Sequence, residues 1–388
     1  MNERKLGDVV DLISGRDLTS DQYNSHGRGI PYVMGASNMI DGKLAIERWT
    51  ESPSVVGLKN DIIISVKGTV GELVIQKEEK VHLSRQVMSI RPHEGLENKY
   101  VYYFIKYYLD RLREKAKGLI PGISREDILN IDFFTSPKDQ QQQVVLILDK
   151  AQALIDKRKQ AIAKLDELVQ AVFLDMFGDP IKNANSRKIS KLKEVSELIT
   201  DGTHHSPEPM TEGIPYITAK HVKVNNIDFY SNPTYISESD HTAIYKRCPV
   251  KKGDILYIKD GATTGIAAIN PYEFEFSMLS SLALIRIDIK YATPQYVVSY
   301  LNNQYVKEQI TNNMSGAAIK RLTLAKINDI KIPIPDLETQ HKYVGVFERY
   351  LIQKGKLIES LQQLESNFQA LLQKAFKGEL IVRDGVTV

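Results

Sequence analysis

The segment nearest to a methyltransferase pocket is Asn270-Pro271-Tyr272. Enzymes that methylate a flipped base need an Asn-Pro-Pro-Tyr-like pocket together with a glycine-rich loop for the cofactor. This segment lacks one of the two prolines, no such loop accompanies it, and its neighbours are typical of a hairpin. We therefore interpret it as a turn.

The nearest match to a metal-dependent nuclease combines Asp61 with Glu78-Glu79-Lys80. Nuclease chemistry requires carboxylates and a lysine gathered around a metal ion. Residues 78–80 are typical of a charged turn between two strands. Loose motif matches have a high false-positive rate, so a solvated turn is favoured by roughly ten to one.

His204, His205 and His221 raise the question of a zinc site. Adjacent histidines on an extended chain point to opposite faces, and a His-x₃₋₅-His spacing is absent. The glycine loops at 67–71 and 259–265 do not form a phosphate-binding loop, because no Lys-Ser/Thr follows the last glycine. The sequence therefore predicts neither a catalytic site nor a bound metal in this chain.

Polar loops around glycine indicate a different role, contact with DNA. Small residues let backbone N–H groups approach phosphates, and arginine, asparagine and glutamine side chains reach base edges. Each candidate taken singly is as readily a solvated surface residue. The candidates in the first half are Arg16, Arg28, Lys67, Thr69, Arg85 and Lys117. Those in the second half are His204, His205, Lys220, His221, Lys259, Thr263, Lys320 and Arg321.

Composition limits the protein class. A length of 388 residues predicts two to three domains. The net charge of +3 excludes a polybasic chain, so a nucleic-acid surface must be local. Cys248 is the only cysteine, which excludes an internal disulfide and a cysteine-cluster metal site. The N-terminus has no apolar signal segment, and no apolar run approaches ~18 residues. We expect a soluble cytoplasmic protein.

The scaffold for these loops begins with a helix predicted over residues 139–177, which contain no glycine or proline. Its apolar residues recur at steps of four and three, the pattern of a coiled-coil seam. A helix of this size is roughly 55–60 Å long and needs a second long helix to cover its seam. The seam residues are Val144, Leu148, Ala151, Ile155, Ile162, Leu165, Val169, Val172 and Met176, and only Arg158 interrupts them.

A second long helix is predicted over residues 338–377. Its seam is less regular, because Lys354 and Glu365 occupy seam positions and Gly355 follows the first. The two helices could belong to unrelated domains, but their matching lead-in segments favour pairing. The apolar seam residues are Val344, Phe347, Leu351, Ile358, Leu361, Phe368, Leu372 and Ala375.

The globular segments repeat in the same order as the helices. A repeat of about half the chain indicates duplication of a whole domain with its helix. The matched pairs are GIPYV at 29–33 with GIPYI at 213–217, KNDIII at 59–64 with KGDILY at 252–257, strands at 86–90 and 281–287, helices at 99–112 and 294–310, strands at 131–137 and 330–335, and Pro137 to Gln142 with Pro335 to Gln340.

This ordered set resembles the specificity subunits of type I restriction–modification systems over nearly the whole chain. The resemblance rests on the two Gly-Ile-Pro-Tyr segments, the Lys-Gly-Asp-Ile strand start at Lys252 and the Lys-Gly-Thr loop at Lys67. Gln142 and Gln340 match the glutamine that opens each family helix after a proline. Asn60 replaces the glycine expected in the first Lys-Gly-Asp, a change compatible with the same turn.

The resemblance implies two target-recognition domains, each followed by a long helix, with the helices packed antiparallel to hold the domains apart. It also implies double-stranded DNA as ligand and two methyltransferase subunits, carrying S-adenosylmethionine, as partners. Restriction/translocase subunits that hydrolyse ATP would join that complex. No cofactor and no membrane is expected for this chain itself.

We thus predict an α+β fold with two similar target-recognition domains, separated by a pair of long antiparallel helices (a coiled coil) in a pseudo-two-fold internal repeat. The predicted function is non-catalytic recognition of a bipartite, asymmetric DNA target. The alternatives are a stand-alone methyltransferase or nuclease, and a coiled-coil scaffold without a DNA role. The expected domains are recognition domain 1 at 1–137, the first helix at 138–180, recognition domain 2 at 181–336, and the second helix with the tail at 337–388.

Overall fold

The chain forms two compact units. Unit 1 comprises Met1–Lys159 with Ser360–Val388, and unit 2 comprises Gln160–Glu359. The residues that the computed structural model describes are 2–116, 121–180, 188–312 and 321–380.

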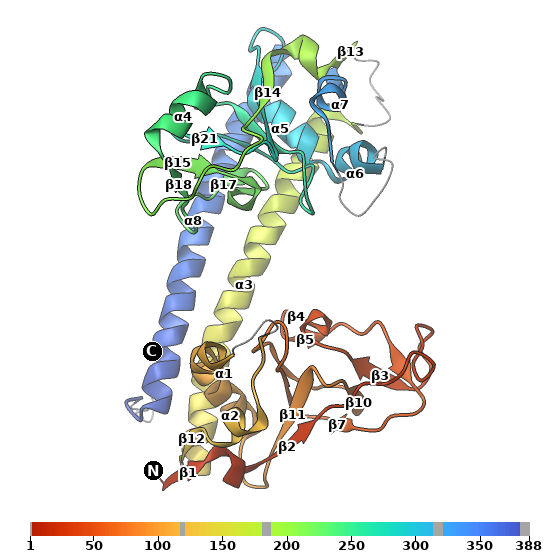
Figure 1. The fold of residues 1–388 in the computed structure, drawn as a ribbon, viewed down its shortest axis with the longest axis vertical. Coiled ribbons are helices and arrows are strands. Elements are labelled where there is room, and N and C mark those ends of the chain that lie inside the picture. The colour runs from red at the N-terminus through yellow and green to blue at the C-terminus, as the bar shows by residue number, and fades with distance from the viewer. Residues whose placement is uncertain (1, 117–120, 181–187, 313–320, 381–388) are drawn as a thin grey trace. The chain divides into compact units, whose positions relative to one another are not determined.

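Each of two long helices contributes one of its halves to unit 1 and the other half to unit 2 (Figure 1). They are α3 (Lys138–Phe177) and α8 (Leu337–Phe376), each of 40 residues. The helices predicted at 139–177 and 338–377 are therefore confirmed at nearly the predicted bounds.

Unit 1 contains two four-stranded sheets. The first has the order β2 (Val10–Ser14), β11 (Val87–Pro92), β8 (Ile62–Ser65), β9 (Leu73–Ile75). The second has the order β6 (Trp49–Thr50), β3 (Ile30–Val33), β10 (Lys80–Leu83), β7 (Val56–Leu58). The remaining elements are β1 (Asn2–Lys5) paired with β12 (Asp132–Thr135), β4 (Met39–Ile40) paired with β5 (Lys43–Leu44), the 3₁₀ helices η1 (Leu6–Asp8) and η2 (Ala36–Asn38), and the helices α1 (Asn98–Lys115) and α2 (Arg125–Leu129).

Unit 2 repeats the order of the first sheet and most of the second, which confirms the predicted duplication; its second sheet has three described strands, without a counterpart of β7. Its first sheet has the order β14 (Ser196–Asp201), β22 (Leu282–Ile287), β19 (Ile255–Ile258), β20 (Ala267–Ile269). Its second has the order β18 (Tyr235–Ile236), β15 (Ile214–Ile217), β21 (Ser277–Met278). The remaining elements are β13 (Lys188–Lys191) paired with β23 (Lys331–Ile334), β16 (Val222–Lys223) paired with β17 (Asn226–Ile227), the 3₁₀ helices η3 (Leu192–Val195) and η4 (Ala219–His221), and the helices α4 (Glu238–Tyr245), α5 (Pro294–Asn302), α6 (Gln304–Asn312) and α7 (Leu324–Asn328).

Two strands of the first sheets, β8 and β19, are buried on both faces, which explains their continuous apolar residues. In β8, Ile62 and Ile64 pack into the cluster that includes the helices, whereas Ile63 packs into the cluster shared with the second sheet. In β19, Ile255 and Leu256 divide between the two clusters in the same way. Because side chains alternate across a strand, a run buried on both faces has no polar positions.

The long helices pack antiparallel within each unit. In unit 1, Leu148 near the start of α3 shares a core with Leu372 near the end of α8. The arrangement is reversed in unit 2, where Phe173 near the end of α3 meets Tyr343 near the start of α8. The predicted coil positions that are buried are Val144, Leu148, Ile155, Val169, Phe347, Phe368, Leu372 and Ala375. The half-buried ones are Ala151, Ile162, Leu165, Val172, Met176, Val344, Leu351, Ile358 and Leu361.

A buried glutamine joins each long helix to the shorter helix beside it. Gln340 accepts from the backbone N–H of Thr293, and its amide donates to the carbonyl of Pro335 at 2.9 Å. Its counterpart in α3 is Gln141, which accepts from the backbone N–H of Glu97 and whose amide donates to the Ser136 carbonyl at 2.8 Å. The match of Gln142 with Gln340 is therefore wrong by one residue, and Gln142 is exposed.

A repeated turn precedes β8 and β19. Asn60 and Gly253 both have positive φ, 73° and 88°, so the asparagine takes the left-handed conformation that it tolerates better than most residues. The aspartate that follows each turn, Asp61 or Asp254, is buried and bound at both oxygens by an arginine at 2.8 Å. Asp61 thus has a structural partner, Arg91. The turn expected at 78–80 is confirmed for Glu78 and Glu79, whereas Lys80 begins β10.

A polar network replaces apolar packing where Lys354 interrupts the α8 seam. Its ammonium lies 2.8 Å from the Asp166 carboxylate of α3, which also accepts from the Tyr350 hydroxyl at 2.7 Å. Burial alone would lower the pKa of Lys354, but its hydrogen bonds to Asp166 and Tyr350 outweigh burial and raise it. The Lys354 side chain is only 11% exposed, so this pair belongs to the helix interface of unit 2.

Replacing Lys354 by Met should lower the free energy of unfolding by about 1–3 kcal/mol, because Asp166 loses its charged partner. Lys342→Met is the matched control, since Lys342 pairs with Glu338 on the same helix and both side chains are largely exposed. Its effect should stay below about 1 kcal/mol. Urea unfolding followed by circular dichroism measures both variants. Equal effects would contradict a structural role for the Lys354 pair.

Candidate nucleic-acid interface

Loops of unit 1 meet at one edge of its two sheets. β2 and β8 both run antiparallel to β11, so the carboxyl ends of β2 and β8 lie at the same edge of the first sheet. β3 runs parallel to β10, so the carboxyl ends of these two strands lie at the same edge of the second sheet. The backbone N–H of Arg16 donates to the Leu83 carbonyl at 2.8 Å, and that of Ser84 donates to the Val33 carbonyl at 3.0 Å. We call residues 14–17, 34–38, 66–71, 84–86 and 121–123 the first loop edge.

Unit 2 builds the same edge from the equivalent loops. The backbone N–H of Thr203 donates to Met278, and that of Leu279 donates to Ile217, at 2.9 and 3.1 Å. Lys259 N–H donates to the Ser281 carbonyl at 2.9 Å. We call residues 201–205, 218–221, 259–265, 279–281 and 321–322 the second loop edge.

A glycine makes the chain crossing at each edge possible. A Cβ atom at Gly15 would lie 2.0 Å from the Ser84 carbonyl oxygen, and one at Gly202 would lie 1.9 Å from the Met278 carbonyl oxygen. These distances are far inside van der Waals contact. The backbone therefore approaches so closely that only glycine fits, and this approach positions the polar residues that follow.

Gly202→Ala should destabilise unit 2 by about 2–3 kcal/mol, because the strand link at Met278 must shift. Gly355→Ala in α8 is the control, since a Cβ there meets no atom within 4 Å. That variant should be neutral or stabilising by up to about 1 kcal/mol. Thermal unfolding measures both variants, and an undisturbed Gly202→Ala protein would contradict the close approach.

The first loop edge brings together Arg16, Lys67, Thr69 and Arg85, all exposed. Arg85 is oriented by Asp17, with its Nε 2.7 Å from a carboxylate oxygen. The structure does not bring Arg28 to this edge, because Arg28 precedes β3 and so lies at the other end of that strand. Lys117 lies outside the described residues.

The second loop edge collects most of the second-half candidates. The exposed ones are His204, His205, Lys220, Thr263 and Arg321. Lys220 donates to the side chains of Asn232 and Thr234, and Arg321 pairs with Asp260 at 3.2 Å. Lys320 lies outside the described residues.

Two candidates in this edge, His221 and Lys259, are buried. His221 accepts from Thr218 N–H at 3.0 Å, and its other ring nitrogen lies 2.9 Å from the Asn232 carbonyl. Burial lowers the pKa of His221, and Asn38 holds the same position in unit 1. His221 and Lys259 therefore support the loops from inside. Their exposed neighbours are the residues that can contact a ligand directly.

Two arginines at the edges are not predicted by any sequence pattern. Arg247 follows α4, an element without a described counterpart in unit 1, and binds the Asp201 side chain and the Gly202 carbonyl. Arg125 opens α2 and donates to the Ser14 hydroxyl at 2.8 Å. Neither lies in a glycine-rich segment, so only the contacts with β2 and β14 identify them.

The segments considered for catalysis have ordinary structural roles. Asn270 accepts from the Tyr272 backbone N–H at 3.0 Å, which makes a local turn. The expected hairpin is wrong, because the segment links β20 to β21 and these strands belong to different sheets. Cys248 is buried, and burial raises the pKa of its thiol to about 12. Among the described residues, no group of three or more His, Cys, Asp or Glu side chains is placed to hold a metal ion. Within the described ranges of the chain, no helix has both the length and the apolar composition that a membrane crossing requires.

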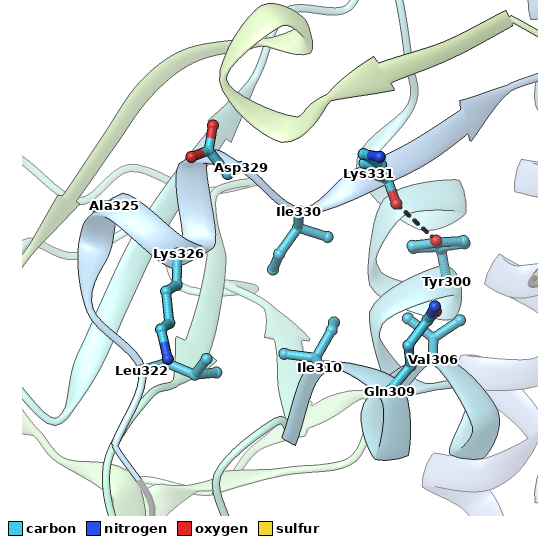
Figure 2. A pocket seen from close by; sticks show the side chains of 10 residues that line it. All are labelled: Tyr300, Val306, Gln309, Ile310, Leu322, Ala325, Lys326, Asp329, Ile330 and Lys331. Carbon is cyan, nitrogen blue, oxygen red and sulfur yellow. Dashed lines mark hydrogen bonds between the residues drawn. The ribbon is translucent and has the colours of Figure 1, made fainter. Parts of the chain in front are cut away.

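Unit 2 also contains a cavity of about 500 Å³ bordered by α6, α7 and β23. Figure 2 shows Tyr300 at its wall, where the hydroxyl donates to the Lys331 carbonyl at 2.7 Å. Asp329 at the rim is paired with Lys191 at 2.8 Å. Its described lining residues are otherwise largely apolar or amide side chains, a composition without a reactive cluster.

Comparison with known proteins gives a consistent result. The family model of the type I restriction modification DNA specificity domain matches residues 1–167 and 186–365. The type I restriction enzyme EcoBI specificity subunit of Escherichia coli is 20% identical, over 97% of this chain and 85% of that protein.

Two solved structures share the fold. The type I restriction-modification S subunit from M. genitalium is 18% identical, with coverage of 97% and 96% and a TM-score of 0.50. A chain from a study of complex assembly and conformational transition of the type I R-M system is also 18% identical, with coverage of 98% of each chain and a TM-score of 0.52.

Proposed function

This chain belongs to the family of type I restriction modification DNA specificity domains, and from that premise we propose that it is the subunit that selects the DNA sequence on which such a system acts. The observation that supports this function most directly is the pair of equivalent loop edges. Each gathers exposed cationic and polar side chains from loops far apart in the sequence. Such side chains can contact phosphates and base edges in the major groove.

The target would be bipartite and asymmetric, because the two edges present different side chains. The first offers Arg16, Lys67 and Arg85, whereas the second offers histidines and Arg321. Each recognition domain would read one part of the target. The long helices would set the length of the unread spacer between the parts, as the family resemblance implies.

We further propose that the chain is not itself catalytic. Two methyltransferase subunits would carry S-adenosylmethionine, and restriction/translocase subunits would hydrolyse ATP. Asp61, the aspartate considered for the nuclease alternative, forms an ion pair with Arg91. This pairing supports the proposal that catalysis belongs to the partner subunits. Labelled S-adenosylmethionine incubated with the purified chain and DNA tests it, since methyl transfer by the chain alone would overturn the proposal.

The DNA interface is tested by binding at several salt concentrations, with the methyltransferase subunits present. Arg16→Ala with Arg85→Ala should weaken binding and lower the salt slope, by about 1 for each phosphate that is no longer neutralised by an arginine. Lys59→Ala is the control, because this exposed lysine lies in the turn before β8, at the other end of that strand. Arg28→Ala decides whether the interface extends beyond the first loop edge.

Methylome sequencing of a host that carries this chain and its methyltransferase partners gives the target itself. Two short methylated blocks separated by unread bases are expected. A continuous motif, or methylation independent of this chain, would contradict the proposed function.

A further inference from the structure

A buried lysine distinguishes the second loop edge from the first. Lys259, directly after β19, is 2% exposed, and Val66 holds the equivalent position after β8 at 1%. The equivalence follows from the backbone, since Val66 N–H donates to Gln86 and Lys259 N–H donates to Ser281 at the start of the next strand. Unit 1 shows that an apolar residue suffices for the fold at this position.

Lys259 lies between two carboxylates, and unit 1 lacks these carboxylates as well as the lysine. Its Nζ lies 3.5 Å from Asp201 Oδ2 and 3.2 Å from Asp260 Oδ2. Asp201 ends β14 and is 3% exposed. The strand register places Ser14 at the Asp201 position in unit 1, and Lys67 stands at the Asp260 position.

These carboxylates also contact three side chains at the surface, two arginines and a histidine. Asp201 lies 3.2 Å from Arg247 Nη2 and 3.4 Å from His204 Nε2. Asp260 lies 3.2 Å from Arg321 Nε. The three outer side chains are 53%, 52% and 60% exposed. One buried ammonium is therefore connected, through two carboxylates, to three groups that a ligand can reach.

The buried charges of this network are not explained by a gain in folding stability. Removing a charged pair from water is costly, and an apolar replacement of similar volume is often as stable. The benefit of the network lies in orientation. Lys259 offsets one of the two negative charges from inside, so the carboxylates can contact the outer side chains while the cluster keeps a net positive charge from Arg247 and Arg321.

We propose that Lys259 is a positioning residue: through Asp201 and Asp260 it holds Arg247, His204 and Arg321 in the geometry with which unit 2 reads its part of the DNA target. The inference rests on the proposed function and names the group that sets specificity in one half of it. It predicts that the network governs recognition by unit 2 alone.

The main test replaces the buried pair by the residues of unit 1, in the double variant Asp201→Ser/Lys259→Val. The net charge is unchanged, so nonspecific attraction to DNA should stay the same. The variant is assembled with the methyltransferase subunits, and methylation is measured on DNA altered in either part of the target. Discrimination in one part should fall about tenfold, because Arg247 and His204 lose the carboxylate that orients them. Discrimination in the other part should not change.

The single variant Lys259→Val separates positioning from stability. It removes the ammonium from beside Asp201, which is buried, and from beside Asp260, and it should lower the melting temperature. Adding Asp201→Ser should restore the melting temperature but not the discrimination, whereas a purely structural role predicts recovery of both. Lys252→Met is the control, because Lys252 pairs with Glu273 at the surface.

Arg247→Ala tests the outer part of the network without touching the buried pair. It should cause the same one-sided loss of discrimination in a normally folded protein. If the wild-type complex is selective and either Arg247→Ala or the double variant keeps full discrimination, the inference is overturned while the proposed function stands. If the wild-type complex shows no sequence selectivity, both fail together.

Discussion

Leu148→Asp should unfold unit 1. Leu148 in α3 is fully buried in the cluster that joins α3, α1 and the end of α8, with Phe104 and Leu372 among its members. An aspartate there must either lose its hydration as an anion or take up a proton at the cost of a raised pKa. We expect a loss of at least about 4 kcal/mol in the free energy of unfolding.

Leu146→Asp is the matched control, two positions earlier on the same helix and 56% exposed. It should change the stability by less than about 1 kcal/mol. Chemical unfolding of the isolated chain, followed by circular dichroism, measures both. A cooperative transition of wild-type stability in Leu148→Asp would show that this part of the seam is not packed. Ile162, an alternative position from the same seam, is half-buried and should respond less.

Exchanging residues 188–335 for those of a family member with another target should change one part of the recognised sequence and leave the other intact. The exchange begins at β13 because Leu192 and Val195 belong to the core of unit 2. It ends before α8, so that Tyr343 and Phe347 stay in the same core as Phe173. Methylome sequencing of a host carrying the hybrid gives the new target.

The reciprocal exchange of residues 1–136 is the control and should alter only the other part of the target. Each unit has its own hydrophobic clusters, which is the physical basis for expecting independent reading. A change in both parts after a single exchange would show that the two domains do not recognise DNA independently. A hybrid that methylates the original target would show that residues 188–335 do not carry specificity.

Local sequence patterns were sufficient to predict the helices and strands, but not which residue makes a given contact. The seams of both long helices, the duplicated order and the turn before β8 and β19 follow from spacing and residue type. The helix-opening glutamine does not, because adjacent glutamines at 140–143 offer several equal choices. The choice of Gln141 depends on which side chain reaches the backbone of Glu97, a residue more than forty positions away.

The sequence by itself determined that the protein is a duplicated α+β chain with two long helices, since apolar periodicity and glycine or proline breaks act over a few residues. Only the tertiary structure decided which polar residues meet. Arg16 and Arg85 come together because β3 and β10 run parallel and Gly15 lets the chain cross them closely. Arg247 joins the second edge through Asp201, and Lys259 turns inward where Val66 does in unit 1. These are contacts between segments far apart in the chain, and their energies depend on strand order and burial, which no local pattern encodes.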